Sequence, residues 1–215
     1  MPAARDSLLD AAYSALARRP WSAVRMVDVA AAAGVSRQTL YNEFGSKEGL
    51  ARALVRREAD AYLAGVERAL TAPADPSAGA GERLTAAAEW TTSAARDNDL
   101  VRALLTGSWS ERLPSPTLTA VPSAAAVPAQ RRADGPLPSP GDLVALVRDR
   151  AVTVLSGAGA AKSDAAKSDA AEMSRTCELA VRLALSCVAA PPGEGGVADL
   201  VRSVLQRPAP AAVWN

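Results

Sequence analysis

The chain reads VDVAAAAGVSRQTLYNEFGSK at residues 27–47, two short apolar-patterned segments separated by a glycine. Gly34 stands where a helix must end and the chain must turn, a place that favours a residue tolerant of positive φ. Ser36 follows as a natural N-cap for a second helix. The pattern predicts helices over about 27–33 and 36–42, which together form a helix-turn-helix.

The second predicted helix carries side chains suited to nucleic acid. In a helix-turn-helix this helix enters the major groove, and its first turn reaches the base edges. Arg37 can pair with guanine, Gln38 with adenine, and Thr39 can touch a thymine methyl group. Ser36, Tyr41, Asn42 and Lys47 are placed to bind phosphates on either side of the groove. Leu40 and Phe44 are the apolar residues expected to anchor this helix.

The composition favours an all-α protein of one medium domain or two small ones. Of 215 residues, 49% are hydrophobic and only 4% aromatic, so the core must be built from Ala, Leu and Val. There is no histidine, and Cys177 and Cys187 are too far apart for a CxxC motif. We find no phosphate-binding glycine loop or nucleophile elbow. We therefore expect no catalytic site, no metal and no cofactor.

Apolar spacing predicts helices along most of the chain. Their expected ranges, besides the two above, are 4–18, 47–70, 82–95, 97–109, 142–156, 168–190 and 196–206. The proline-rich stretch 113–141 is expected to be a long loop that could be disordered. No run of 18 apolar residues and no secretion signal occurs, so we expect no membrane association and a cytoplasmic location.

The stretch VDVAAAAGVSRQTLYNEFGSKEGL resembles the DNA-binding domain of the TetR (tetracycline-repressor-like) family of bacterial transcription regulators. The resemblance covers about residues 5–70 and beyond them concerns architecture only. It implies a three-helix DNA-binding domain, 1–46, joined by a long helix to a helical ligand-binding and dimerisation domain, 47–215. It also implies a homodimer that binds a palindromic operator in double-stranded DNA, usually as a repressor released by a small molecule.

Two residues depart from the family pattern. Arg25 stands where a small hydroxyl residue often caps the first helix of the motif, and it could contact a phosphate instead. Gly49 stands where a glutamate often completes a capping box, a loss on the order of 1 kcal/mol. Neither departure argues against DNA binding.

The second half offers candidates for a partner surface and a ligand pocket. Its last two predicted helices are apolar on more than one face, and the family dimerises through this region as a four-helix bundle. The candidate interface residues are Leu179, Leu183, Val188, Val197, Leu200, Val201 and Val204. The pocket the family keeps in this half would be apolar and would suit a hydrophobic effector such as a fatty acid, hydrocarbon or lipophilic drug. Its candidate lining residues are Leu84, Ala87, Trp90, Leu104, Leu105, Trp109, Leu146 and Val147, with Leu100, Leu143 and Val154 beside them.

Three other interpretations remain open from the sequence. A helical enzyme would need catalytic groups that the chain lacks. A regulator that its ligand activates on DNA fits the same residues as a ligand-released repressor. An architectural, non-specific DNA-binding protein would need a strongly basic patch, whereas the net charge is only +1.

Overall fold

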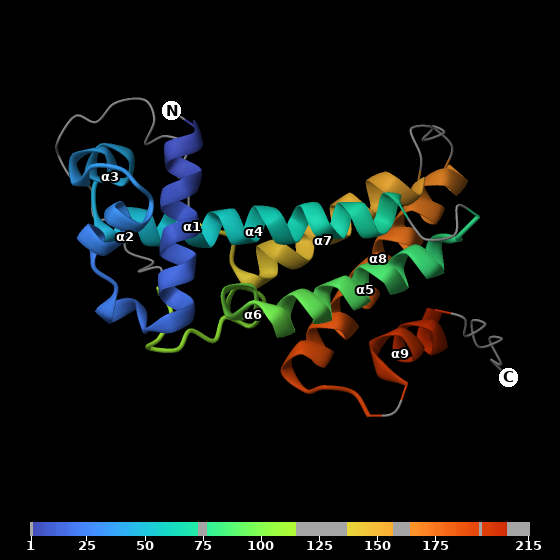
Figure 1. Cartoon of the computed structure of the whole chain (residues 1–215). Coiled ribbons are helices and arrows are strands. Elements are labelled where there is room, and N and C mark those ends of the chain that lie inside the picture. The colour runs from blue at the N-terminus through green and yellow to red at the C-terminus, as the bar shows by residue number, and fades with distance from the viewer. Residues whose placement is uncertain (1, 73–76, 115–136, 157–163, 194, 206–215) are drawn as a thin grey trace, which may run out of the picture. The chain divides into compact units, whose positions relative to one another are not determined.

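The computed structural model describes residues 2–72, 77–114, 137–156, 164–193 and 195–205, and within these ranges the regular structure is entirely helical (Figure 1). This confirms the predicted all-α class. The helices are α1 (Pro2–Arg18), α2 (Met26–Ala32), α3 (Arg37–Phe44), α4 (Lys47–Thr71), α5 (Ala80–Asp97), α6 (Asp99–Thr106), α7 (Pro140–Ser156), α8 (Asp164–Ala189) and α9 (Gly196–Leu205), with one 3-10 turn, η1 (Trp21–Ala23). The chain divides into two compact units, one formed by Met1–Asp60 and Gly107–Pro138, the other by Ala61–Thr106 and Ser139–Asn215.

The first unit is built on α1, which packs against α2 and α3. Leu8 of α1 and Leu40 of α3 are fully buried in its core, beside Val29 of α2. An ion pair of 2.7 Å between Asp10 Oδ1 and Arg57 Nη1 joins α1 to the first half of α4. These contacts fix the recognition segment on a small rigid scaffold.

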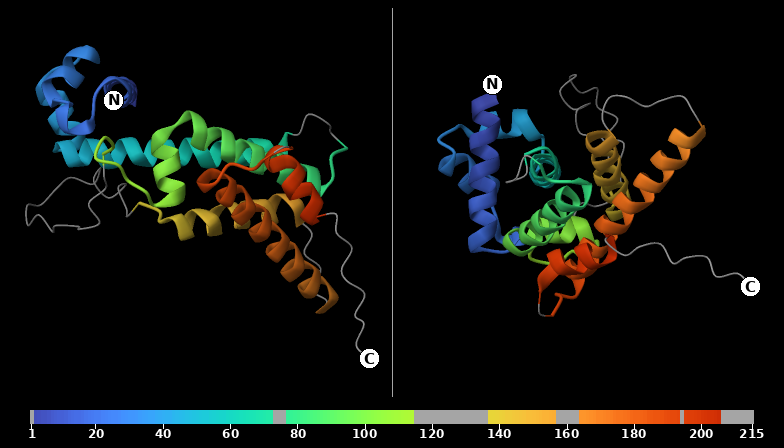
Figure 2. Two further views of the ribbon diagram at one scale, coloured as in Figure 1. Left: turned by 90° about the horizontal axis from the view of Figure 1, so that it is seen from below. Right: turned by 90° about the vertical axis from the view of Figure 1, so that its right-hand side faces the viewer.

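The second unit packs α5 against α8 and α9, and α7 against α8, with α9 folded back beside α5 (Figure 2). The second half of α4 meets α5 at an unusually close contact. An added Cβ on Gly65 would lie 2.1 Å from the Trp90 ring, so only glycine leaves room for this indole. Trp90 Nε1 donates a hydrogen bond of 3.1 Å to the Tyr62 backbone oxygen on α4.

Two expected boundaries are wrong. The helix predicted over 97–109 ends at Thr106, because Gly107 adopts a φ of 73° that a continuing helix does not allow. The proline-rich stretch is shorter at its C-terminal end than predicted, since Pro140 already opens α7, a position that proline tolerates in a helix. Its residues 115–136 lie outside the described part of the chain.

Within the described ranges, none of the helices combines the length and the apolar character that a bilayer crossing requires.

Candidate nucleic-acid interface

The recognition helix α3 begins and ends at residues whose types suit those roles. The Ser36 hydroxyl accepts a hydrogen bond of 3.0 Å from the Thr39 N–H, which confirms Ser36 as the N-cap. Gly45 ends the helix at a φ of 72°, and its N–H donates to the Tyr41 carbonyl oxygen. Leu40 and Phe44 are buried, as expected for its anchors. The opposite, polar face of α3 is therefore held in a fixed orientation.

The side chains predicted to contact bases lie on that face. Arg37 and Gln38 are exposed in the first turn of α3, and Thr39 is half-buried. Gln38 Nε2 donates to Asn42 Oδ1 at 2.8 Å. One amide N–H and the amide oxygen of Gln38 remain, which is the pair that adenine recognition requires. The Arg37 guanidinium lies 5.5 Å from the centre of the Tyr41 ring, which limits its rotamers.

The Lys47 ammonium makes two contacts within the first unit. Its Nζ donates to the Ser22 carbonyl oxygen at 3.1 Å and lies 5.6 Å from the centre of the Trp21 ring. An ammonium has three donors, so two stay available for a phosphate. Lys47 thus ties the start of α4 to η1 while keeping its charge at the surface.

Arg25 is the N-cap of α2, and its side chain makes no cap hydrogen bond. Instead, Nε and Nη2 donate to the Asp28 carboxylate at 3.0 and 2.9 Å, and Arg19 reaches the same carboxylate at 3.2 Å. The Arg25 hydrogen bond, followed by the charges of Arg25 and Arg19, lowers the pKa of Asp28. Asp28 therefore competes with a DNA phosphate for the Arg25 guanidinium. The sequence reasoning had predicted the phosphate contact and missed this carboxylate. The three-residue spacing of Arg25 and Asp28 at a helix start was the available signal.

Arg5 is a second residue near the recognition helix whose contacts the sequence reasoning missed. Its guanidinium lies 4.8 Å from the centre of the Phe44 ring and 3.9 Å from the Glu43 carboxylate, so α1 contacts the last turn of α3. A lone arginine at the start of the chain gives no sequence signal for this role.

The N-terminus of α4 stays capped although glycine, and not the glutamate of the family pattern, stands at position 49. Ser46 Oγ still accepts the Gly49 N–H at 3.1 Å, so the hydroxyl cap is kept. The backbone N–H of Glu48 and the Ser46 hydroxyl lower the pKa of the Glu48 carboxyl. The Glu48 carboxylate, at the second position of α4, therefore interacts with the N-terminus of this helix. In the family pattern the glutamate that does so stands at the third position.

The candidate pocket residues are not all brought together. Leu84, Ala87 and Val147 line an apolar cavity of about 10 Å³ between α5, α7 and α8. Leu104 and Leu105 are buried on α6, and Trp90 turns toward α4. The other two do not line this cavity. Leu146 is 37% exposed, and Trp109 follows the end of α6 and belongs to the other unit.

The candidate interface residues divide by exposure. Leu179 and Leu200 are exposed, at 43% and 36%, and Leu183, Val188 and Val204 are half-buried. Val197 and Val201 are buried at 8% and 0% within the unit itself, where α9 packs on α5. These two valines are therefore packed within the protomer, and their role in a dimer interface stays a prediction.

The capped α3 with its exposed polar first turn, braced by α1 and α2, defines a helix-turn-helix DNA-binding protein. Residues 8–54 match the model of the tetR family of bacterial regulatory proteins. This N-terminal segment is therefore similar to the DNA-binding domain of TetR-family transcription regulators.

Two relatives of known name are similar to this chain over about a third of its length. The chain is 53% identical over 68 residues to the HTH-type transcriptional regulator AlkX of Mycobacterium tuberculosis, a match covering 32% of each chain. It is 41% identical over 75 residues to the HTH-type transcriptional repressor LfrR of Mycolicibacterium smegmatis, covering 35% of this chain and 36% of the relative. These matches span about a third of either relative's length.

A solved structure supports the fold over nearly the whole chain. The TetR-family transcriptional regulator from Streptomyces coelicolor aligns with a TM-score of 0.52 at 21% identity, covering 95% of this chain and 78% of that one. At that identity the likeness concerns the fold alone.

Proposed function

We propose that this protein is a homodimeric repressor that acts in the cytoplasm by binding a palindromic operator in double-stranded DNA. The observation that carries the proposal is the exposed first turn of α3, where Arg37 and Gln38 project from a helix capped by Ser36. A relative that shares 41% identity over 75 residues is named as a repressor. In a bound dimer the two copies of α3 would lie about 34–36 Å apart, one turn of the DNA helix.

The same proposal includes release from DNA by a small hydrophobic ligand: a fatty acid, a hydrocarbon or a lipophilic drug. The side chains around the space between α5, α7 and α8 are apolar except for Thr91. The cavity there is only about 10 Å³, close to the smallest space that holds one water. A ligand at this place would therefore have to separate α7 from α5 and α8, a movement that binding energy must drive.

The test of the DNA-binding part is a genome-wide capture of fragments by the purified protein at about 150 mM salt, which suppresses weak non-specific binding. We expect one or a few palindromes. The double variant Arg37→Ala, Gln38→Ala should lose discrimination between the operator and a scrambled site. Arg68→Ala, which removes an exposed charge on α4 outside the proposed dimer interface, is the matched control and should behave as the unaltered protein.

The outcomes separate the competing interpretations. If the double variant keeps operator affinity and specificity, the assignment of the reading helix is wrong. If the protein binds all fragments alike, the architectural interpretation is favoured. If operator binding appears only when a hydrophobic ligand is added, the ligand activates binding and does not release the protein.

A further inference from the structure

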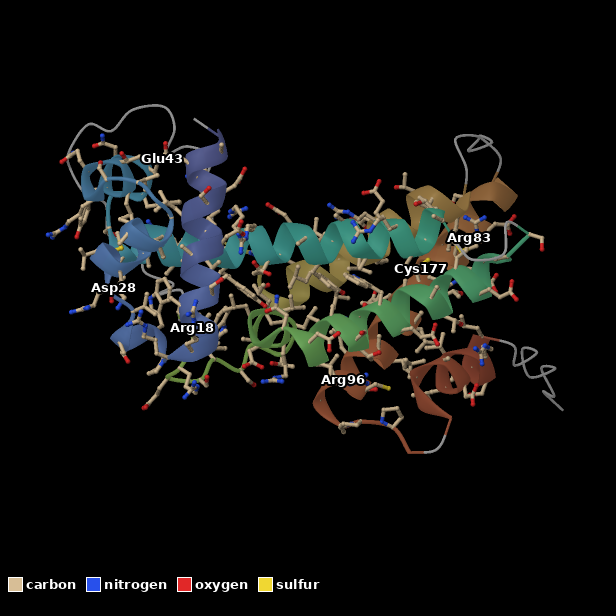
Figure 3. All side chains as sticks on the ribbon, in the orientation of Figure 1. Arg18, Asp28, Glu43, Arg83, Arg96 and Cys177 are labelled. Carbon is tan, nitrogen blue, oxygen red and sulfur yellow. The ribbon has the colours of Figure 1, made fainter. Side chains whose placement is uncertain are left out.

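A preformed hollow of the second unit lies apart from the predicted pocket. A hollow of about 330 Å³ opens where the end of α5 and the start of α6 meet the end of α8 and the start of α9. Its volume is in the range of sites that hold small organic ligands, whereas the predicted pocket is nearly filled. Figure 3 labels Arg96 on α5 near the connection between α8 and α9.

The floor of the hollow is apolar. Ala95 of α5 and Cys187 of α8 are buried at 1% and 5% exposure, and Val197 of α9 closes the same floor at 8%. Pro191 and Pro192 contribute ring carbons from the connection between α8 and α9. A ligand that binds here would be stabilised by burying an aliphatic segment.

The rim of the hollow is cationic. Arg96 and Arg102 line it, and no acidic side chain does so in the part of the chain that the structure describes. Arg102 is neutralised in part by Asp99, whose carboxylate lies 2.5 Å from its Nη2. Arg96 makes no ion pair or side-chain hydrogen bond with any described residue. An unengaged guanidinium at the edge of an apolar hollow is suited to a carboxylate, which it can hold by two parallel hydrogen bonds.

We propose that this hollow binds an amphipathic organic anion, a medium-chain monocarboxylate, with its charged end at Arg96 and its chain over Ala95, Cys187 and Val197. The site goes beyond the proposed function, because none of the predicted pocket residues lines it and it does not depend on operator binding. Two candidate residues of the dimer interface, Val188 and Val197, do line it. A ligand there would contact α5, α6, α8 and α9 at once. It would therefore favour the arrangement of these four helices that the structure shows.

The experiment measures octanoate binding to the purified full chain by isothermal titration calorimetry, with octanol as the uncharged probe of the same chain length. We expect octanoate to bind more tightly than octanol. Arg96→Gln should weaken octanoate binding at least about tenfold and leave octanol binding unchanged, since only the charged hydrogen bonds are lost. Arg96→Lys keeps the positive charge but loses the planar guanidinium. Its octanoate affinity should lie between those of the unaltered protein and of Arg96→Gln.

The control is Arg175→Gln, an equal charge change at an exposed position on α8 away from the hollow, which should bind octanoate as the unaltered protein does. The proposal is overturned if octanoate binds no better than octanol, if it does not bind, or if Arg96→Gln and Arg175→Gln behave alike. Operator binding measured without octanoate is a separate readout. Loss of the anion site leaves it intact, whereas failure of the repressor proposal appears in the unaltered protein.

Discussion

At the scale of single residues, Asp28 restrains two of the cations that α2 and its neighbours present. It accepts hydrogen bonds from Arg25 and Arg19, and these arginines hold its pKa below the ordinary carboxyl value. The ion pairs are therefore complete at neutral pH and are lost only as the pH falls through that lowered pKa. Such a carboxylate competes with DNA phosphate for the Arg25 guanidinium.

Asp28→Asn should accordingly release Arg25 and strengthen DNA binding. We expect tighter binding to any duplex and a steeper dependence of log affinity on log salt, by up to about one unit for each additional phosphate that the protein neutralises. Fluorescence anisotropy at several salt concentrations measures both. Asp60→Asn makes the same charge change at an exposed site on α4. If the two variants match, the effect is one of net charge and Asp28 has no special role.

Tyr62 predicts a pH dependence of stability. Its side chain is 2% exposed, and its hydroxyl lies 3.1 Å from Thr91 Oγ1. Burial raises the pKa of Tyr62 to about 12 from the ordinary value near 10. A phenol that ionises later in the folded state stabilises it below pH 10, and this contribution is lost between about pH 10 and 12. Two pKa units correspond to about 3 kcal/mol.

Urea unfolding as a function of pH checks this. The free energy of unfolding should fall above about pH 10, and the fall should be smaller in Tyr62→Phe, which has no phenol to ionise there. Tyr41→Phe removes a half-buried phenol on α3 and serves as the control. An equal alkaline loss in Tyr62→Phe and the unaltered protein would assign the effect to other groups.

Single residues also show what the sequence could and could not tell. Ser36, Leu40 and Phe44 were predictable, because capping and burial follow from residue type and position along one helix. The Asp28 pairing and the Arg5 contact depend on which side chains the folded scaffold brings within reach. The end of the helix predicted over 97–109 was wrong because Gly107, with its positive φ, ends the helix after Thr106.

At the scale of elements, the close contact between α4 and α5 requires a glycine at position 65. A methyl group on Gly65 would overlap the Trp90 indole, a rigid neighbour whose Nε1 is hydrogen bonded. Gly65→Ala should therefore destabilise the protein by roughly 1–3 kcal/mol, since overpacking outweighs the stabilisation of about 1 kcal/mol that alanine brings to a helix.

Gly81→Ala is the matched control, because Gly81 lies in the first turn of α5 and an added Cβ there meets nothing within 4 Å. That variant should be neutral or more stable by up to about 1 kcal/mol. Chemical denaturation compares the two. If both glycines respond alike to alanine, helix propensity and not the Trp90 contact governs Gly65.

Helix positions were predictable to within a few residues because apolar spacing reflects helix geometry directly. Which surface covers each apolar face could not be predicted. Val197, Val201 and Leu200 share one short apolar helix, yet the first two are buried within the protomer and the third is exposed. A helical pattern shows that a face is covered and does not show whether the cover comes from the same chain or another.

At the scale of the whole molecule, the two compact units correspond to two tasks that the proposed repressor must combine. The first unit carries the reading helix, and the second carries the exposed leucines and the hollow. A palindromic operator is bound tightly only when two reading helices are held together. Dimerisation through the second unit should thus determine operator affinity without touching DNA.

Leu179 on α8 and Leu200 on α9 are exposed within the described chain, so their replacement should not disturb the protomer's own core. The variant Leu179→Lys, Leu200→Lys should raise the dimer dissociation constant at least about a hundredfold, since burial of each unpaired ammonium costs roughly 1.4 kcal/mol or more. Sedimentation velocity gives the oligomeric state, and circular dichroism should show unchanged helicity. Operator affinity should fall with the dimer, while binding to an isolated half-site stays the same.

The control is Leu146→Lys, which places the same charge on a similarly exposed leucine of α7, outside the proposed interface. It should remain dimeric with full operator affinity. If Leu146→Lys dissociates the dimer and the α8–α9 variant does not, the subunits associate through another face. If neither variant changes a dimer that sedimentation detects, the half-buried residues Leu183, Val188 and Val204 cannot form its interface either, because the exposed leucines lie beside them on the same two helices.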